Sequence, residues 1–209
     1  MNQQLEEYIL RHLDDETGVL AELFRYTHLN VPYSGMISGH EQGRLLSIFS
    51  CMINPSYILE IGTFTGYSAI CLAEGMKPDG RLHTIEQNDE TAEIAWSFFE
   101  KAGIANRITL HTGNAIEIIT QLDERFDLVF IDATKKQYLE YYHAVFDKVN
   151  TGGYILVDNI LWYGKPADPS ICDETTVQLR NFNDFVRNDV RVQKAIVQNR
   201  DGMYILRKK

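Results

Sequence analysis

The sequence predicts an α/β protein with a mostly parallel sheet that helices cover on both faces. Between residues 57 and 157, short apolar runs rich in β-branched and aromatic residues alternate with stretches of helical spacing. This alternation is typical of parallel strands joined by crossover helices. Residues 192–207 depart from it, because two apolar runs are joined there through residues 199–202, with Gly202 where positive φ is needed. The sheet is therefore expected to end in an antiparallel hairpin.

The expected elements follow one another along the whole chain. Two or three amphipathic helices are expected within residues 2–27 and 38–52, before the first strand. The strands are expected at residues 57–61, 82–85, 108–110, 128–131 and 154–157. The helices that alternate with them are expected at residues 67–75, 89–102, 115–122 and 138–149, with Gly103 as the C-terminal cap of the second.

One domain accounts for all 209 residues, with helices in residues 1–52 and the sheet core in residues 53–209. No linker rich in Gly, Ser or Pro divides the chain, and its length permits a core without disulfides or a structural metal. The three cysteines, Cys51, Cys71 and Cys172, are scattered and include no C-x-x-C pair. This pattern favours a reducing compartment.

Hydropathy and charge argue against several functional classes. No run of eighteen apolar residues occurs, and the first twenty residues include five acids, so neither a membrane span nor a secretory leader is expected. A cytoplasmic protein is the expectation. The net charge of −9 disfavours a large nucleic-acid footprint, although residues 180–209 carry eight Lys and Arg against three Asp.

A glycine-containing turn follows the first strand and leads directly into a helix. Gly62 and Gly66 let the backbone turn sharply and bring a ligand to the helix N-terminus. The spacing is neither G-x-G-x-x-G nor a P-loop, so a nucleoside ligand with a smaller anion fits best. Glu86, at the end of the second strand, stands where an acid accepts hydrogen bonds from ribose hydroxyls. The alternatives are an ordinary βα turn and an acid that favours the next helix start.

Acidic and amide side chains follow the fourth and fifth strands. Asp132 ends one strand, and Asp158 and Asn159 end the next, so adjacent parallel strands would bring all three together. Carboxylate and amide oxygens suit Mg²⁺ or Ca²⁺ better than Zn²⁺. The alternative for Asp158 and Asn159 is a turn or a helix cap. Lys135 would lie close to such a cation, which would disfavour the charged form of the lysine and let it act as a base.

Four segments together resemble a known family. They are ILEIGTFTGYSA (58–69), TIEQN (84–88), FDLVFIDATKKQY (126–138) and GGYILVDNILWYGK (152–165). From about residue 36 to the C-terminus, the chain is similar to the cation-dependent, S-adenosylmethionine-dependent O-methyltransferases of the catechol and caffeoyl-CoA type. The resemblance implies a Rossmann-like class I methyltransferase fold with a seven-stranded, mostly parallel sheet.

The resemblance also implies roles for single residues. It assigns the metal to Asp132, Asp158 and Asn159, with Asp132 also among the catalytic and cofactor-contacting positions, and makes Lys135 the catalytic base. For S-adenosylmethionine it implies Glu86 at the ribose, Glu60, Gly62 and Ser68 around the methionine part, Ala115 at the adenine, and Met36 in the segment that closes over the cofactor. Thr134 replaces an acid that is common in the family motif.

The implied reaction is methyl transfer to a hydroxyl of a catechol-like small molecule, which the divalent cation (Mg²⁺ first, with Ca²⁺ or Mn²⁺ as alternatives) would bind. Residues 162–174 read as a loop over the substrate, and Trp162 and Tyr163 could stack on its ring. Two alternatives stay open: methylation of 5-hydroxyuridine in tRNA, with Arg180, Arg187, Arg191 and Lys194 gathered on one face, and a non-catalytic protein that binds S-adenosylmethionine. The resemblance further implies a homodimer.

Overall fold

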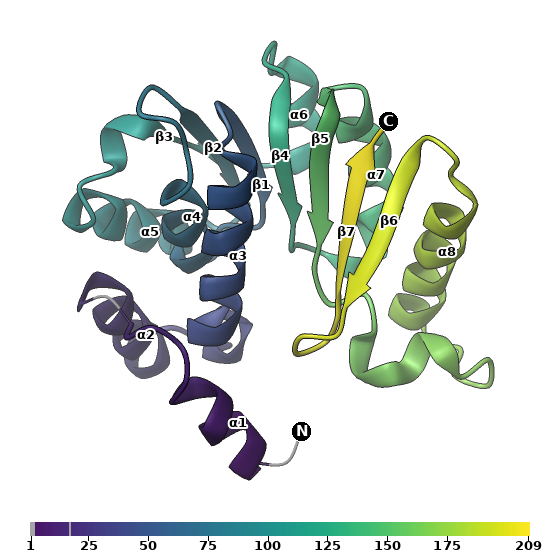
Figure 1. Cartoon of the computed structure of the whole chain (residues 1–209), viewed down its shortest axis with the longest axis horizontal. Coiled ribbons are helices and arrows are strands. Elements are labelled where there is room, and N and C mark those ends of the chain that lie inside the picture. Colours follow the sequence, from purple (N-terminus) through teal and green to yellow (C-terminus); the bar gives the residue numbers. More distant parts are fainter. Residues whose placement is uncertain (1–2, 17) are drawn as a thin grey trace.

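A computed structural model describes residues 3–16 and 18–209 and contains one seven-stranded sheet in the order β3-β2-β1-β4-β5-β7-β6 (Figure 1). Its first five strands are parallel, and β7 runs antiparallel to both β5 and β6. The predicted fold class is therefore confirmed. The strands are Tyr57–Ile61 (β1), Arg81–Glu86 (β2), Ile108–Thr112 (β3), Phe126–Ile131 (β4), Val149–Val157 (β5), Val192–Val197 (β6) and Met203–Lys208 (β7).

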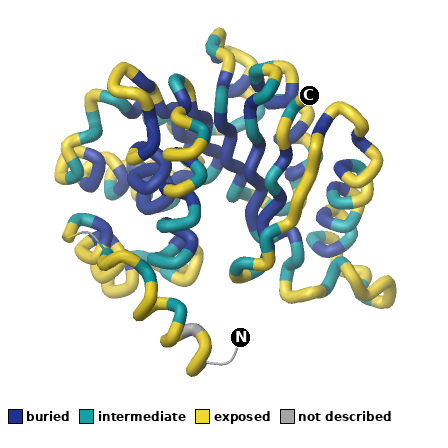
Figure 2. The backbone as a smooth tube through the Cα atoms, viewed as in Figure 1, coloured by how far each residue is buried: buried dark blue, intermediate teal, exposed yellow. Residues whose placement is uncertain are grey.

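Helices cover both faces of the sheet, because successive strand residues point to opposite sides. Leu128 and Phe130 pack in one core with α2, α3, α4 and α5, while Val129 and Ile131 pack in a second core with α6, α7 and α8. Figure 2 shows the central strands as buried between these layers. The α-helices are Gln3–Leu10 (α1), Gly18–Asn30 (α2), Gly39–Ile53 (α3), Tyr67–Ala73 (α4), Asp89–Lys101 (α5), Ala115–Gln121 (α6), Tyr138–Phe146 (α7) and Glu174–Asn188 (α8).

The region expected to be helical over residues 2–27 agrees with the prediction of two or three helices before the first strand. Its described part forms two helices, α1 and α2, interrupted around a cluster of acids at residues 14–16 that precedes Gly18. Leu20 and Leu23 of α2 are buried, and the Thr27 hydroxyl donates to Thr65 Oγ1 at 3.0 Å. The helix expected at 38–52 is present as α3. Across the described residues, no helix has the length and apolar character needed to cross a membrane.

Two elements towards the C-terminus depart from the prediction. The helix expected at 138–149 ends at Phe146, because Val149 already pairs with Phe126 and begins β5. Helix α8 was not among the expected helices, although Asp173 caps it and Leu179, Phe182 and Val186 recur on its buried face. The positive φ expected at Gly202 is confirmed at +79°.

Candidate active site

The candidate site lies at the carboxyl ends of the three central strands, β1, β4 and β5. Gly62, Asp132 and Asp158 are the first residues beyond these strands, and each continues the ladder through its backbone N–H. Asp132 N donates to Ile61 O at 2.9 Å, and Asp158 N donates to Ile131 O at 3.0 Å. The loop between β6 and β7 reaches the same edge of the sheet (Figure 1). The strand order therefore brings Asp132 and Asp158 together, as the sequence predicted.

Close packing explains why the turn after β1 contains glycines. Gly62 has φ +99°, and a Cβ atom there would lie 2.1 Å from the backbone oxygen of Asp132. Gly66 has φ +95°, and a Cβ atom there would lie 2.7 Å from the Phe99 ring. Each position combines a left-handed backbone with no room for a side chain. The turn is thus fixed against β4 and α5, and the glycines serve packing as well as any ligand.

Glu86 ties this turn to the end of β2. Its Oε2 accepts a hydrogen bond from Phe64 N at 2.6 Å, and its Oε1 accepts from Gln87 N at 2.9 Å. The carboxylate therefore faces the glycine turn. Gly113 N donates to Glu86 O at 2.9 Å, which brings the start of α6, with Ala115 as its first residue, to the same edge of the sheet.

Glu60 is a fully buried acid in β1 with an unused acceptor. The Thr84 hydroxyl donates to its Oε2 at 2.5 Å, whereas its Oε1 has no hydrogen-bond partner within the described structure. Burial raises the pKa of Glu60 to about 8, although the Ser68 and Thr84 hydroxyls oppose the shift. Nearby Asp132 adds to the increase. An unpaired buried oxygen is costly, so this one fits a ligand that donates hydrogen bonds or carries positive charge.

The two aspartates form an acidic pair that includes a buried member. Asp158 is 3% exposed. Burial, and then the charge of Asp132, raise the pKa of Asp158. Asn159 follows with φ +55°, and its side-chain amide makes no hydrogen bond to the rest of the described chain. Two carboxylates that repel each other, beside an amide with no hydrogen-bond partner in the described chain, suit a divalent cation bound through oxygen atoms.

Only two of the three candidate metal ligands are acidic side chains, because the third is the amide of Asn159. Residues 3–16 and 18–209 contain no cluster of three or more His, Cys, Asp or Glu side chains that could hold a metal ion. A cation here would therefore depend on the amide of Asn159 in addition to Asp132 and Asp158. Such a mixed oxygen set leaves further positions for water or a substrate, as is usual for Mg²⁺.

Lys135 lies beside this pair. Its Nζ donates to Asp132 Oδ1 at 2.8 Å, and it lies 6.0 Å from the centre of the Trp162 ring. Trp162 is therefore brought to the site, with a left-handed φ of +41°. Tyr163 also has positive φ but is 79% exposed, so it lies at the surface of the loop. Non-glycine residues in this region are strained and are often found at functional sites.

Among the described residues, Met36 has no hydrogen bond or ring contact with another predicted site residue. It lies in the short 3₁₀ helix Ser34–Met36 and is 58% exposed. The neighbouring Ile37 is buried, and its carbonyl accepts a hydrogen bond from Arg200 at 3.2 Å.

Gln42 is a buried residue of the site that was not predicted from the sequence. Its Nε2 donates to Asp158 Oδ2 at 2.6 Å, and its Oε1 accepts from Arg200 Nη1 at 3.1 Å. One signal was available, because Gln42 precedes the buried Leu46 by one helical turn and so places a polar group on the apolar face of α3. The partner of that polar group was not visible in the sequence.

The basic residues considered for tRNA are mostly engaged within the chain. Arg180 donates to the carbonyls of Pro166, Asp168 and Ile171 at 2.8–3.0 Å and so fixes the loop before α8. Arg191 pairs with Asp189 at 2.6 Å. Lys194 donates to carbonyl oxygens at the C-terminal end of α8, including Val186 O at 2.8 Å. Arg187 is exposed on α8. Three of these four basic side chains are therefore bound to other parts of the chain.

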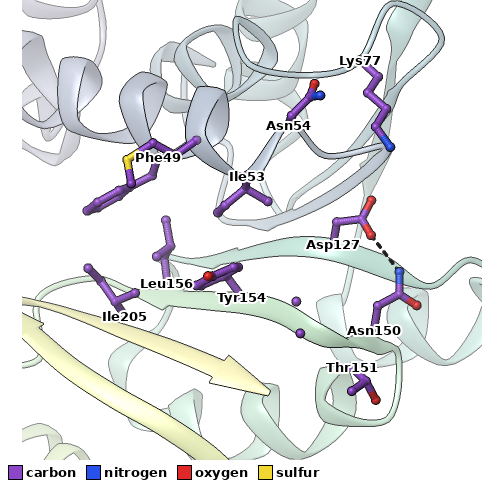
Figure 3. Close-up of a pocket in the computed structure, with 13 residues that line it drawn as sticks. Phe49, Ile53, Asn54, Lys77, Asp127, Asn150, Thr151, Tyr154, Leu156 and Ile205 are labelled. Atoms are coloured by element: carbon purple, nitrogen blue, oxygen red, sulfur yellow. Dashed lines mark hydrogen bonds between the residues drawn. The ribbon is translucent and has the colours of Figure 1, made fainter. Parts of the chain in front are cut away.

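A cavity of about 600 Å³ lies elsewhere, near the amino ends of β4 and β5 (Figure 3). Phe49, Ile53 and Tyr154 line its apolar part. At its polar end Asp127 is already satisfied, because it accepts from Asn150 Nδ2 at 2.8 Å and from the backbone N–H of residue 56 at 2.7 Å. None of the predicted site residues lines this cavity. It is therefore separate from the candidate active site.

A family profile and full-length relatives match this chain. A profile of the O-methyltransferase family matches residues 11–209. The chain is 30% identical to the "Probable caffeoyl-CoA O-methyltransferase 2" of Dictyostelium discoideum, over 99% of this chain and 92% of that protein. It is also 30% identical to the catechol O-methyltransferase of Niastella koreensis, over 95% and 93% of the two chains.

A solved structure shares the whole architecture. The O-methyltransferase TomG from Streptomyces achromogenes, involved in tomaymycin synthesis and crystallised in complex with SAM, is 31% identical to this chain. The TM-score is 0.91, and the match covers 100% of this chain and 99% of TomG. The family profile, the full-length relatives and this structure lead to one conclusion: the chain belongs to the O-methyltransferase family.

Proposed function

We propose that this protein transfers the methyl group of S-adenosylmethionine to a hydroxyl of a catechol-like small molecule, with a divalent cation and with Lys135 as the general base. One observation carries the proposal. The ends of β4 and β5 place Lys135 at 2.8 Å from Asp132 and place Asp158 close enough to Asp132 for their charges to repel. Binding of S-adenosylmethionine alone would require neither the acidic pair nor the lysine.

The cofactor would lie along the ends of β1, β2 and β3. The unpaired Oε1 of Glu60 supports this placement, because the methionine part of S-adenosylmethionine carries an ammonium group and a sulfonium. Ser68, buried at the start of α4, and Gly62 would lie around the same part, with Met36 in the segment over it. Glu86 would accept from the ribose hydroxyls, and Ala115 would contact the adenine. TomG, crystallised with SAM, supports the same cofactor.

The metal would be held by Asp132, Asp158 and Asn159, with Mg²⁺ as the first candidate and Ca²⁺ or Mn²⁺ as alternatives. When bound, such a cation would withdraw electron density from a vicinal diol and lower the free energy needed to remove its proton. The surrounding protein would orient the acceptor: Tyr138 donates to the backbone oxygen of Asp158 at 3.0 Å and so fixes the chain at the end of β5. Positioning of this kind supplies much of the remaining rate acceleration.

Lys135 would take the proton of the acceptor hydroxyl. A phenol with a pKa of about 10 is only about 0.1% ionised at pH 7, so forming the nucleophile costs about 4 kcal/mol. Lys135 Nζ is half-enclosed by Asp132 and the rings of Tyr138 and Trp162, at 5.8 Å and 6.0 Å from the two ring centres. With a divalent cation bound beside Asp132, Lys135 would first release a proton to solvent, and its neutral amine could then accept the proton of the acceptor hydroxyl.

The substrate is proposed to be a small aromatic diol. Trp162 lies beside Lys135 and offers a ring face for stacking, and Tyr163 would contribute at the loop surface. The names of the Niastella and Dictyostelium relatives, a catechol and a caffeoyl-CoA O-methyltransferase, support this class. Residues 162–167 form a kinked segment of 3₁₀ turns, with left-handed Tyr163 and Gly164 at the kink, and only residues 160–161 separate it from the candidate metal ligand Asn159.

A homodimer in the cytoplasm remains part of this proposal. Large apolar side chains are exposed on the N-terminal helices, including Tyr8 at 61% and Leu29 at 69%, and on α3, where Met52 is 76% exposed. The N-terminal helices are therefore proposed as the surface between the two subunits. Light scattering during size-exclusion chromatography would measure the mass directly.

The proposed activity is tested by mass-spectrometric detection of methyl transfer. Caffeate and hypomodified tRNA are supplied as separate acceptors with S-adenosylmethionine, each in Mg²⁺ and in EDTA. The proposal predicts methylated caffeate in Mg²⁺ and a loss of product in EDTA. Transfer to tRNA alone would move the substrate class to RNA. A lack of transfer to both acceptors, with the cofactor bound, would support a non-catalytic protein.

A further inference from the structure

Gln42 links helix α3 to the candidate metal centre, although 116 residues separate it from Asp158. It is 1% exposed, and its Nε2 donates to Asp158 Oδ2 at 2.6 Å. This bond engages one carboxylate oxygen and restrains rotation of the carboxylate. The direction in which the Gln42 amide points therefore affects the geometry that Asp158 offers.

Arg200 determines that direction. A side-chain amide has a donating and an accepting end, and nothing in Gln42 itself prefers one orientation. A guanidinium only donates, and Arg200 Nη1 lies 3.1 Å from Gln42 Oε1. The accepting end of Gln42 is thereby committed to Arg200, which leaves the NH₂ group for Asp158. The reversed amide would set an oxygen against a carboxylate and an NH₂ group against a cation.

Arg200 is itself held in place from two sides. Its Nη1 also donates to the carbonyls of Ile37, at 3.2 Å, and Ser38. The loop that carries it is bound to the chain that follows Asp158, because Leu161 N donates to Asp201 O at 2.9 Å. A Cβ atom on Gly202 would lie 2.4 Å from Leu161 Cγ, so the two segments are closely packed. The β6–β7 loop and the end of β5 therefore form one rigid unit.

From these contacts we propose that Arg200, acting through Gln42, is a positioning residue for the Asp158 carboxylate of the candidate metal centre. The inference rests on the proposed function, because it assumes that Asp158 holds a cation. It adds two residues, from α3 and from the β6–β7 loop, that contact neither the cofactor nor the acceptor in that proposal. Removing the hydrogen-bond partner of a ligand typically weakens metal binding by about 10- to 100-fold.

The test measures Mn²⁺ affinity by electron paramagnetic resonance of the free ion, without cofactor or acceptor. Gln42→Met removes both polar ends at similar volume, and Arg200→Met removes the donors. Gln42→Met should weaken binding about 10-fold and Arg200→Met about 5-fold. The double variant should match Gln42→Met, because Arg200 has no route to Asp158 without Gln42. Lysine, like arginine, has only hydrogen-bond donors, so Arg200→Lys should retain most of the wild-type affinity for Mn²⁺.

Arg207→Met is the matched control. Arg207 lies in the same hairpin and donates to Gln193 at 3.2 Å on its exposed side, so its loss should leave Mn²⁺ affinity unchanged. Unchanged affinity in Arg200→Met would overturn the inference. A double variant clearly weaker than Gln42→Met would also overturn it, since Arg200 would then act by another route.

A second readout keeps the inference separate from the metal proposal. The side-chain NH₂ signals of Gln42 are identified in NMR spectra by their loss in Gln42→Met. The amide protons that give these signals should exchange slowly with solvent in the metal-free wild type and faster in Arg200→Met. Equal exchange in both would overturn the orienting role of Arg200. Wild-type protein that binds no Mn²⁺ would contradict the metal centre of the proposed function, while these signals would still decide the orientation.

Discussion

Lys135 and Lys136 are neighbours with very different surroundings. Lys135 donates to the candidate metal ligand Asp132, whereas Lys136 pairs with the exposed Glu174. Lys135→Met should lower kcat for methyl transfer by about 10²- to 10⁴-fold, which is the usual contribution of a positioned general base. Cofactor affinity, measured by calorimetry, should stay unchanged.

Lys136→Met serves as the control for this prediction. Its side chain makes a surface ion pair, and such pairs contribute about 0–1 kcal/mol to stability. The variant should therefore retain near-normal turnover. Equal loss of kcat in the two variants would show that charge near the loop, and not a base at Lys135, supports the reaction.

Glu60 should make the stability of the cofactor-free protein depend on pH. Its pKa is raised to about 8 in the folded protein, against an ordinary value near 4.5. The folded state therefore binds the proton more tightly. The free energy of unfolding that this proton contributes is complete below about pH 4.5. It is lost as the pH rises towards 8, by up to about 1.4 kcal/mol per pH unit.

Glu60→Gln should remove this dependence, because an amide does not titrate. Between pH 5 and pH 8, the melting temperature of Glu60→Gln should therefore rise relative to that of the wild type. Differential scanning calorimetry at several pH values measures it. A difference that is constant over this range would mean that Glu60 is not a buried titrating acid.

The turn between β1 and α4 offers a test of packing at a single element. Gly62→Ala combines a positive φ with a Cβ atom 2.1 Å from the Asp132 backbone, whereas Gly103→Ala has φ +70° and no atom within 4 Å. Gly103→Ala should cost about 1 kcal/mol of unfolding free energy. Gly62→Ala should cost about 1–3 kcal/mol more, because the backbone must move. Urea unfolding of both variants measures the difference, and equal losses would contradict the close approach.

The elements that the sequence predicted well are those whose signal is local. Buried strands such as β1 and β4 appear as continuous apolar runs, and the hairpin loop contains a glycine at its positive φ. The missed helix α8 has a low mean hydropathy, because polar residues separate Leu179, Phe182 and Val186. The overextended helix α7 ends where a long-range pairing of Val149 with Phe126 takes over.

Across the whole molecule, the predictable part of the candidate site is the part that the strand order creates. Glu86 is the last residue of β2, and Asp132 and Asp158 directly follow β4 and β5, so a parallel sheet suffices to place them on one edge. Gln42 and Arg200 reach the same point from a helix and a hairpin loop, through side-chain contacts across 116 and 158 residues. A single sequence contains no periodicity that reports such contacts.

Asp158 is proposed to support the chemistry through the cation, whereas the cofactor is proposed to lie along the ends of β1, β2 and β3. Asp158→Ala tests this proposal most directly, with S-adenosylmethionine affinity measured by calorimetry and methyl transfer to caffeate measured in Mg²⁺. Thermal unfolding of the variant verifies that it is folded. Cofactor affinity should stay within about 2-fold of wild type, whereas methyl transfer should fall by about 100-fold or more. Normal turnover by Asp158→Ala, in Mg²⁺ or in a parallel reaction without metal, would contradict the proposed metal centre.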